Sequence, residues 1–145
     1  MRTAFLIIAL LLTCSLLVAA KDKPLAEMIQ EADAANVHDQ PKLYIKISQN
    51  QLHVADKSYS SGAPDSGRAA VENVVLYSGK ASDAAIQSGN RLKDTEIDIR
   101  KMADKLRDIK RNLNYDDQAP VQTAMDKLEE MRSKLLNRMF EKKKP

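Results

Sequence analysis

The side chains of this sequence that could do chemistry are few and lie far apart. The sequence has two histidines, His38 and His53, and one cysteine, Cys14. No second histidine or set of carboxylates stands at metal-ligand spacing from either histidine, so both are interpreted as surface residues. The sequence contains neither a Gly-rich phosphate loop nor a Gly-x-Ser-x-Gly elbow. We therefore predict no catalytic, cofactor-binding or metal-binding residue, and expect a protein that is not an enzyme and needs no cofactor.

Two pairs of carboxylates stand four residues apart, Asp94 with Asp98 and Asp104 with Asp108. On a helix each pair would share one face and could hold a cation. Basic residues lie among them: Arg100, Lys101, Lys105 and Arg111. The pairs are therefore interpreted as an internally paired, solvated surface.

One uninterrupted run of basic residues, Lys142, Lys143 and Lys144, lies in a basic tail at 141–145. These lysines are the candidate interaction residues, since a short basic run makes weak contact with an anionic membrane surface. The simpler interpretation is a solubilising segment after a helix, where cations are favoured. No aromatic residue is interleaved to stack on bases, so we expect no nucleic-acid partner.

Residues 1–20 read as a signal peptide that is removed. Arg2 supplies a positive start, an apolar run follows to Val18, and small residues precede Lys21. A retained membrane anchor is the alternative, although the run falls short of the roughly 20 apolar residues that span a bilayer. Cys14 also allows a lipid-modified cysteine, but the apolar run continues beyond it. We expect export to the periplasm or the exterior, and a mature chain without cysteine.

The elements that must position any site are helical. Every third or fourth residue from Leu92 to Leu113 is apolar apart from one threonine: Leu92, Thr95, Ile99, Met102, Leu106, Ile109 and Leu113. The intervening residues are almost all charged, so the spacing predicts a two-faced helix. Such a helix is not stable alone and must bury its stripe against other helices.

The same heptad phase extends back from this stripe to Val71 through small residues. The preserved phase favours one long central helix, with a kink near Gly89. The alternative is two helices separated at Gly89–Asn90. A last helix, 121–140, carries a second stripe that Leu136 and Phe140 broaden, and the short loop before it predicts that it lies antiparallel to residues 92–113, as in a coiled coil.

The earlier part of the chain is less regular. Pro24 to Val37 predicts a first helix, whose acidic character would suit docking beside the basic helix at 91–113. For 42–59 we expect a helix, although Leu43, Ile45 and Ile47 alternate as in a β-hairpin. Serine, glycine and proline predict a loop at 58–66. Together these features predict an all-α fold of four to five helices, in one domain at 21–140.

Several segments resemble uncharacterised secreted helical proteins of bacteria. The similar segments are Ala69–Val71 with Tyr77 and Ala81, Lys93–Ile97, Leu128–Arg132 and Met139–Phe140. The small residues and Tyr77 are also loosely similar to tetratricopeptide hairpins, without a clear 34-residue repeat. The resemblance implies an exported helical domain and supplies no activity.

The function expected from these features is a non-enzymatic exported protein that binds another protein, or a second copy of itself, through a helix face. If the central helix is longer than its neighbours, part of its apolar stripe stays open to a partner. The alternative is peripheral attachment to the cell envelope through the basic tail.

Overall fold

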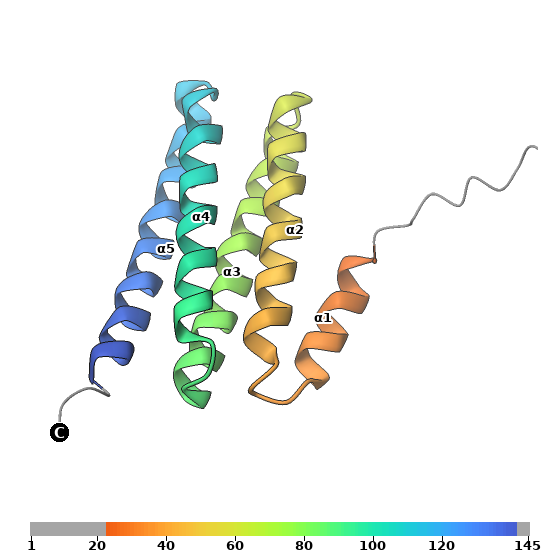
Figure 1. Cartoon of the computed structure of the whole chain (residues 1–145). Helices are drawn as coiled ribbons and strands as arrows, with labels where there is room; N and C mark the ends of the chain where they lie inside the picture. The colour runs from red at the N-terminus through yellow and green to blue at the C-terminus, as the bar shows by residue number, and fades with distance from the viewer. Residues whose placement is uncertain (1–22, 142–145) are drawn as a thin grey trace, which may run out of the picture.

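Five helices make up the part of the chain that the computed structural model describes, residues 23–141. They are α1 (Leu25–Ala34), α2 (Gln40–Ser60), α3 (Pro64–Ser88), α4 (Leu92–Arg111) and α5 (Tyr115–Glu141) (Figure 1). The all-α prediction of four to five helices is confirmed. The expected signal peptide with Cys14, and the lysines Lys142–Lys144, lie outside the described residues.

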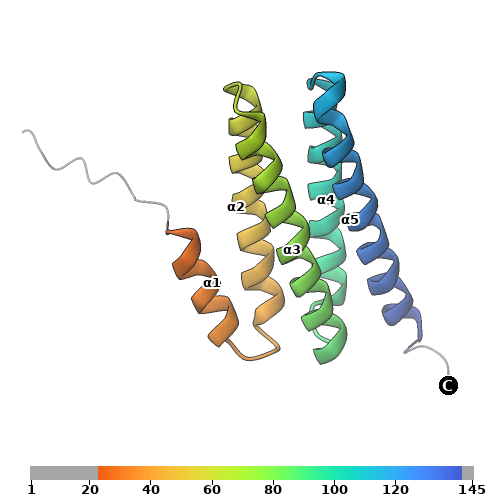
Figure 2. The ribbon, with the colours of Figure 1, turned by 180° about the vertical axis from the view of Figure 1, so that it is seen from behind.

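Helices α2 to α5 run alternately up and down as two hairpins, α2–α3 and α4–α5. The hairpins pack against each other with α3 beside α5 and α2 beside α4 (Figures 1 and 2). The predicted antiparallel pairing of 92–113 with 121–140 is confirmed, because α4 and α5 contact each other along their length. The result is a four-helix bundle with α1 added on one side.

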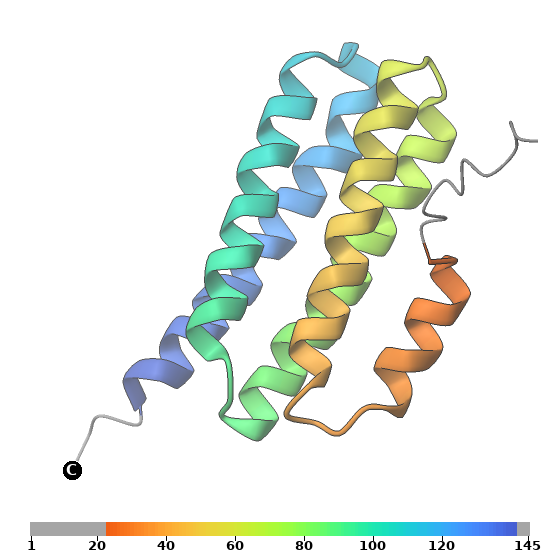
Figure 3. The ribbon, with the colours of Figure 1, turned by 45° about the vertical axis from the view of Figure 1, so that its right-hand side comes forward.

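The preferred single helix from Val71 to Leu113 is wrong. Helix α3 ends at Ser88, the chain reverses through Gly89 and Arg91, and α4 runs back from Leu92 (Figure 3). Gly89, the C-cap of α3, has φ 66°, the left-handed conformation that ends helices. Arg91, the N-cap of α4, is also left-handed, with φ 56°. The heptad phase is the same on both sides because both helices bury a stripe in one core. The alternative boundary at Gly89–Asn90 is therefore the correct one.

Helix α2 confirms the helical prediction for 42–59 and excludes the hairpin. Its apolar residues alternate because α2 has neighbours on three sides, α1, α3 and α4. Ile45 and Ile47 are buried and Leu43 is half-buried, so the apolar face is too broad for a simple stripe. The predicted loop at 58–66 is shorter than expected, since Pro64 already occupies the first turn of α3.

The stripe of α4 is covered inside the bundle. Its members from Leu92 to Ile109 are all buried, and they meet the buried residues of α5: Val121, Ala124, Met125, Leu128 and Leu135. The open stripe expected for a long central helix is thus absent from the described residues, because the chain folds back on itself. Phe140, predicted to broaden the stripe of α5, is instead 64% exposed.

Helix α1 contacts α2, so the prediction that it docks beside the basic α4 is wrong. Met28 and Ala32 are its buried residues. Its end is held by Asp33, which accepts a hydrogen bond of 2.6 Å from the Tyr44 hydroxyl and pairs with Lys80 at 3.4 Å. None of the helices within 23–141 has the length and apolar character needed to cross a membrane.

Candidate functional site

The structure does not bring the predicted chemical residues together. His38 lies exposed in the loop between α1 and α2, and His53 lies exposed on α2. Three of the four carboxylates of the α4 pairs that could hold a cation are instead paired with arginines three residues away: Asp94 with Arg91, Asp104 with Arg107 and Asp108 with Arg111. No cluster of three or more histidine, cysteine or carboxylate side chains within 23–141 could hold a metal ion.

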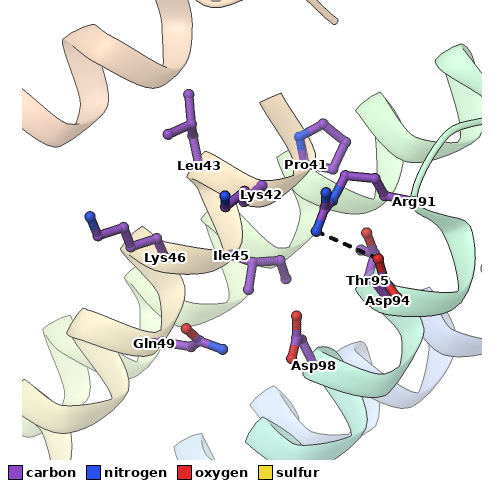
Figure 4. A pocket seen from close by; sticks show the side chains of 10 residues that line it. All are labelled: Pro41, Lys42, Leu43, Ile45, Lys46, Gln49, Arg91, Asp94, Thr95 and Asp98. Carbon is purple, nitrogen blue, oxygen red and sulfur yellow. Dashed lines mark ion pairs between the residues drawn. The ribbon is translucent and has the colours of Figure 1, made fainter. Parts of the chain in front are cut away.

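A cleft of about 470 Å³ lies between the first turns of α2 and the first turns of α4. Two of its residues, Asp94 and Asp98, were singled out in the sequence as a carboxylate pair. The full lining is Pro41, Lys42, Leu43, Ile45, Lys46, Gln49, Arg91, Asp94, Thr95 and Asp98 (Figure 4). We define this surface as the α2–α4 cleft.

The two walls of the α2–α4 cleft carry opposite charges. Helix α2 contributes Lys42 and Lys46 to the lining, and the start of α4 contributes Asp94 and Asp98 together with Arg91. Figure 4 shows the ammonium group of Lys46 directed away from α4. Ile45 and Thr95 are buried, 5% and 2% exposed, and form its floor. An apolar floor between charged walls favours a ligand that carries both signs of charge around an apolar centre.

Both helices that line the cleft begin at this end of the bundle. Neither α2 nor α4 has a side-chain hydrogen bond capping its first turn. The free N–H groups of a first turn carry a partial positive charge, which adds to that of the neighbouring lysines. On α2 this contribution is small, because Pro41 has no N–H and the N–H groups of Gln40 and Leu43 already donate to backbone carbonyl oxygens.

Arg91 stands at the mouth of the cleft in a strained conformation. It is the one non-glycine residue with positive φ in the described chain. The left-handed conformation costs an L-residue with a β-carbon roughly 1–2 kcal/mol. The side chain of Arg91 reaches over the cleft to Asp94, with 3.5 Å between Nη2 and Oδ2. Strain of this kind concentrates at functional sites.

Sequence reasoning missed this cleft because its two walls stand about fifty residues apart in the chain. Lys42 and Lys46 look like ordinary solvated residues of one helix, and Asp94 and Asp98 like those of another. The one available signal is the arginine after Gly89–Asn90, where a smaller residue would suit the turn. Lys142, Lys143 and Lys144, the predicted interaction residues, lie beyond the part of the chain that the structure describes.

A comparison with protein families, curated proteins and solved structures finds no match to this chain. The resemblance to secreted helical and tetratricopeptide proteins therefore stays a hypothesis. The chemistry of the cleft has to be argued from its own residues. Those residues include no histidine, cysteine or serine, and their charged groups suit binding by ion pairs and hydrogen bonds.

Proposed function

We propose that this protein is a non-enzymatic, exported binding module, and that the α2–α4 cleft receives a short segment of another protein. The observation that carries the proposal is the juxtaposition of a lysine wall and an aspartate wall over the buried Ile45. Such a surface recognises a segment with alternating acidic and basic side chains. The apolar stripe of α4 is not the docking surface, because the bundle covers it.

The dimensions of the cleft favour a peptide segment. From Lys42 to Gln49 the α2 wall spans two helical turns, about 10 Å at 1.5 Å per residue. About three residues of extended chain cover that distance. The lysine side chains are exposed and long, so they can follow peptides of different sequence.

Export is the second part of the proposal and is supported by the signal-like residues 1–20. A binding module in the periplasm or outside the cell would encounter its protein partners there. Because the sequence has no cysteine after Lys21, no disulfide within residues 21–145 can stabilise such a protein in an oxidising compartment. Its stability would come from its helical core.

Site-specific photocrosslinking tests the proposal. A photoreactive residue in place of Gln49, in the cleft, should form a discrete crosslinked product with a protein of the cell-envelope extract. The same residue in place of Gln87, exposed near the end of α3, is the matched control and should form none.

Charge reversal identifies the surface that binds. Lys42→Glu with Lys46→Glu should abolish the Gln49 crosslink, whereas Lys101→Glu with Lys127→Glu, which changes the net charge equally at exposed sites elsewhere, should leave it intact. Equal crosslinking from both positions, or loss of the product with both reversals, would contradict the proposal.

A further inference from the structure

A hollow of about 410 Å³ lies where the last turns of α4 meet the first turns of α5, at the opposite end of the bundle from the α2–α4 cleft (Figure 1). Its lining is Arg107, Lys110, Arg111, Gln118, Gln122 and Met125. We define this surface as the α4–α5 hollow. Half of its side chains are cations and none is an acid, whereas the α2–α4 cleft carries both signs of charge. A hollow lined by one sign of charge attracts ligands of the opposite sign.

Lys110 brings a half-buried charge to this hollow without an acidic partner. Its ammonium group donates a hydrogen bond to the amide oxygen of Gln122 on α5, with 2.7 Å between Nζ and Oε1. The neighbouring cations Lys105, Arg107 and Arg111 each pair with an aspartate, but Lys110 forms no ion pair among the described residues. A neutral amide orients the ammonium group and leaves its charge uncompensated. An anion in the hollow would supply the missing charge.

The two arginines of the hollow can bind an anion while they keep their present partners. Arg107 and Arg111 donate through Nη1 to aspartates three residues earlier, Asp104 and Asp108. These pairs lie on the exposed surface, where an ion pair contributes little free energy. Because a guanidinium carries several N–H groups, each arginine has donors for a second anion. Together with the point charge of Lys110, these planar groups are the donors that proteins use for phosphate oxygens.

A second hollow, of about 380 Å³, adjoins the first and shares Lys110, Gln118 and Gln122 with it. Its other residues are Tyr115, Asp116 and Ala119. Tyr115 is 88% exposed, so its ring is open to a flat group of a ligand. Asp116 repels an anion here, and its carboxylate can accept hydrogen bonds from hydroxyl or N–H groups. The two hollows therefore orient a ligand, with its anionic end on the cations and its neutral, flat end on Tyr115.

We propose that these adjoining hollows bind a small phosphate ester of an aromatic group, the chemistry that nucleotides share, with the phosphate on Lys110, Arg107 and Arg111 and the ring on Tyr115. Each hollow has the volume of a small-molecule site, roughly 300–1,000 Å³. A phosphate ester carries about two negative charges and three acceptor oxygens, so it matches the three cations better than a carboxylate does. The site shares no residue with the α2–α4 cleft and is independent of the peptide segment proposed for that cleft.

Isothermal titration calorimetry at low salt tests the inference on the chain from Lys21, which contains all five helices. Adenosine monophosphate should bind, and added salt should weaken its binding. Inorganic phosphate should bind about fivefold more weakly because it lacks the stacking contact, and adenosine, which lacks the charge, should not bind at the same concentrations. A protein that fails to bind adenosine monophosphate at concentrations on the order of 1 mM, or that binds adenosine or inorganic phosphate equally well, would overturn the inference.

Variants of the cations locate the phosphate. Lys110→Gln should weaken the binding of adenosine monophosphate about tenfold or more, through the loss of a charged hydrogen bond. Lys101→Gln removes a cation from the exposed face of the same helix and should bind within about twofold of the wild type, because distant charges are screened. Because Lys110 is half-buried, Arg107→Gln with Arg111→Gln, at exposed positions, is the second test and should weaken adenosine monophosphate and inorganic phosphate in parallel.

Variants of the aromatic residues locate the ring. Tyr115→Ser should weaken the binding of adenosine monophosphate about fivefold and leave that of inorganic phosphate unchanged. Phe140→Ser is the matched control, since it removes an aromatic residue that is 64% exposed at the opposite end of the bundle, and it should bind both ligands like the wild type. Equal losses from Lys110→Gln and Lys101→Gln, or from Tyr115→Ser and Phe140→Ser, would refute the proposed site.

Discussion

Arg132 on α5 donates two hydrogen bonds to a single carboxylate oxygen of Glu96 on α4, at 2.9 Å from Nε and 2.7 Å from Nη2. The side chains are 20% and 10% exposed, so the pair lies inside the α4–α5 interface. Burial opposes the charge of Arg132, but the hydrogen bond to Glu96 and the charges of Glu129 and Glu96 outweigh it and raise the pKa of the guanidinium. The pair thus joins α4 to α5 across their interface.

Removal of one member of this pair should destabilise the bundle more than removal of both. Arg132→Met leaves the Glu96 carboxylate unpaired in the interface and should lower the free energy of unfolding by about 2 kcal/mol. Glu96→Leu combined with Arg132→Met leaves no unpaired charge inside the interface, since Glu129, the other partner of Arg132, is 48% exposed. The double variant should stay within about 1 kcal/mol of the wild type. Urea denaturation measures both, and a double variant as unstable as the single one would disprove the argument.

Two glycines of α3 should respond to alanine in opposite directions. A β-carbon at Gly79 would lie 3.5 Å from the Met131 methyl, an ordinary contact, so Gly79→Ala should stabilise by up to about 1 kcal/mol through helix propensity. A β-carbon at Gly67 would lie 2.8 Å from the ring of Tyr59, so Gly67→Ala should destabilise by about 1 kcal/mol or more. Thermal unfolding followed by circular dichroism compares the two variants. A change in stability of the same sign in both would contradict the contact described for one of the two glycines.

The hydroxyl of Ser82 is buried without a hydrogen-bond partner. Ser82→Ala should therefore stabilise the protein by about 1 kcal/mol, because an unsatisfied polar group leaves the core. Ser78→Ala is the matched control. Its hydroxyl donates to that of Ser48 at 3.2 Å, so its loss should destabilise by a similar amount. Chemical denaturation at neutral pH measures both, and a destabilised Ser82→Ala would show that the hydroxyl has a partner in solution.

The attachment of α1 should weaken in alkali through Tyr44. Burial, and then the hydrogen bond to Asp33, raise the pKa of the Tyr44 hydroxyl from 10.0 to about 12. A pKa raised by folding adds stability that is complete below pH 10 and is lost as the pH rises towards 12. We expect a loss of about 1 kcal/mol, the size of one net hydrogen bond, in that window.

Comparison of tyrosine variants isolates this effect from other groups that titrate in alkali. Tyr44→Phe should lack the extra loss of stability between pH 10 and pH 12, whereas Tyr115→Phe, at an exposed position, should keep it. Denaturation at pH 9.5 and pH 11.5 measures the difference. The same slope in both variants would assign the alkaline loss to other residues.

Arg91→Gly should separate stability from binding. Glycine adopts the left-handed conformation without strain, so the free energy of unfolding should rise by up to about 1 kcal/mol, less the entropy that a glycine loses on folding. The same change removes the cation at the mouth of the α2–α4 cleft and should reduce the Gln49 crosslink several-fold. If Arg91→Gly left both the stability and the Gln49 crosslink unchanged, Arg91 would have no role in the binding site.

The parts of the fold that could be predicted from the sequence are those encoded by one helix at a time. The stripe from Leu92 to Ile109 has one spacing and one apolar side and predicted α4, and the second stripe at 121–140 predicted the helix that packs against it. The reversal at Gly89–Arg91 could not be predicted in the same way, because a heptad phase describes which side is buried and not the direction in which the chain runs.

The candidate site needed the tertiary structure. Lys46 and Asp98 belong to helices that meet only in the bundle, and each has the sequence pattern of an ordinary solvated residue. For Phe140 the prediction erred in the other direction. Its apolar character predicted a buried side chain, but it is exposed at the last turn of α5. The sequence pattern shows which residue types lie on one face of a helix. Whether that face is buried depends on the helices that pack beside it.

The order of the helices also bears on how fast the molecule folds. Each of the two hairpins closes through a connection of three residues, 61–63 and 112–114, so most contacts in the bundle form between helices adjacent in the sequence. A chain with such local contacts has a small loop-closure entropy to overcome and folds on the order of milliseconds or faster. A chain with this topology can thus reach its native state soon after it is synthesised.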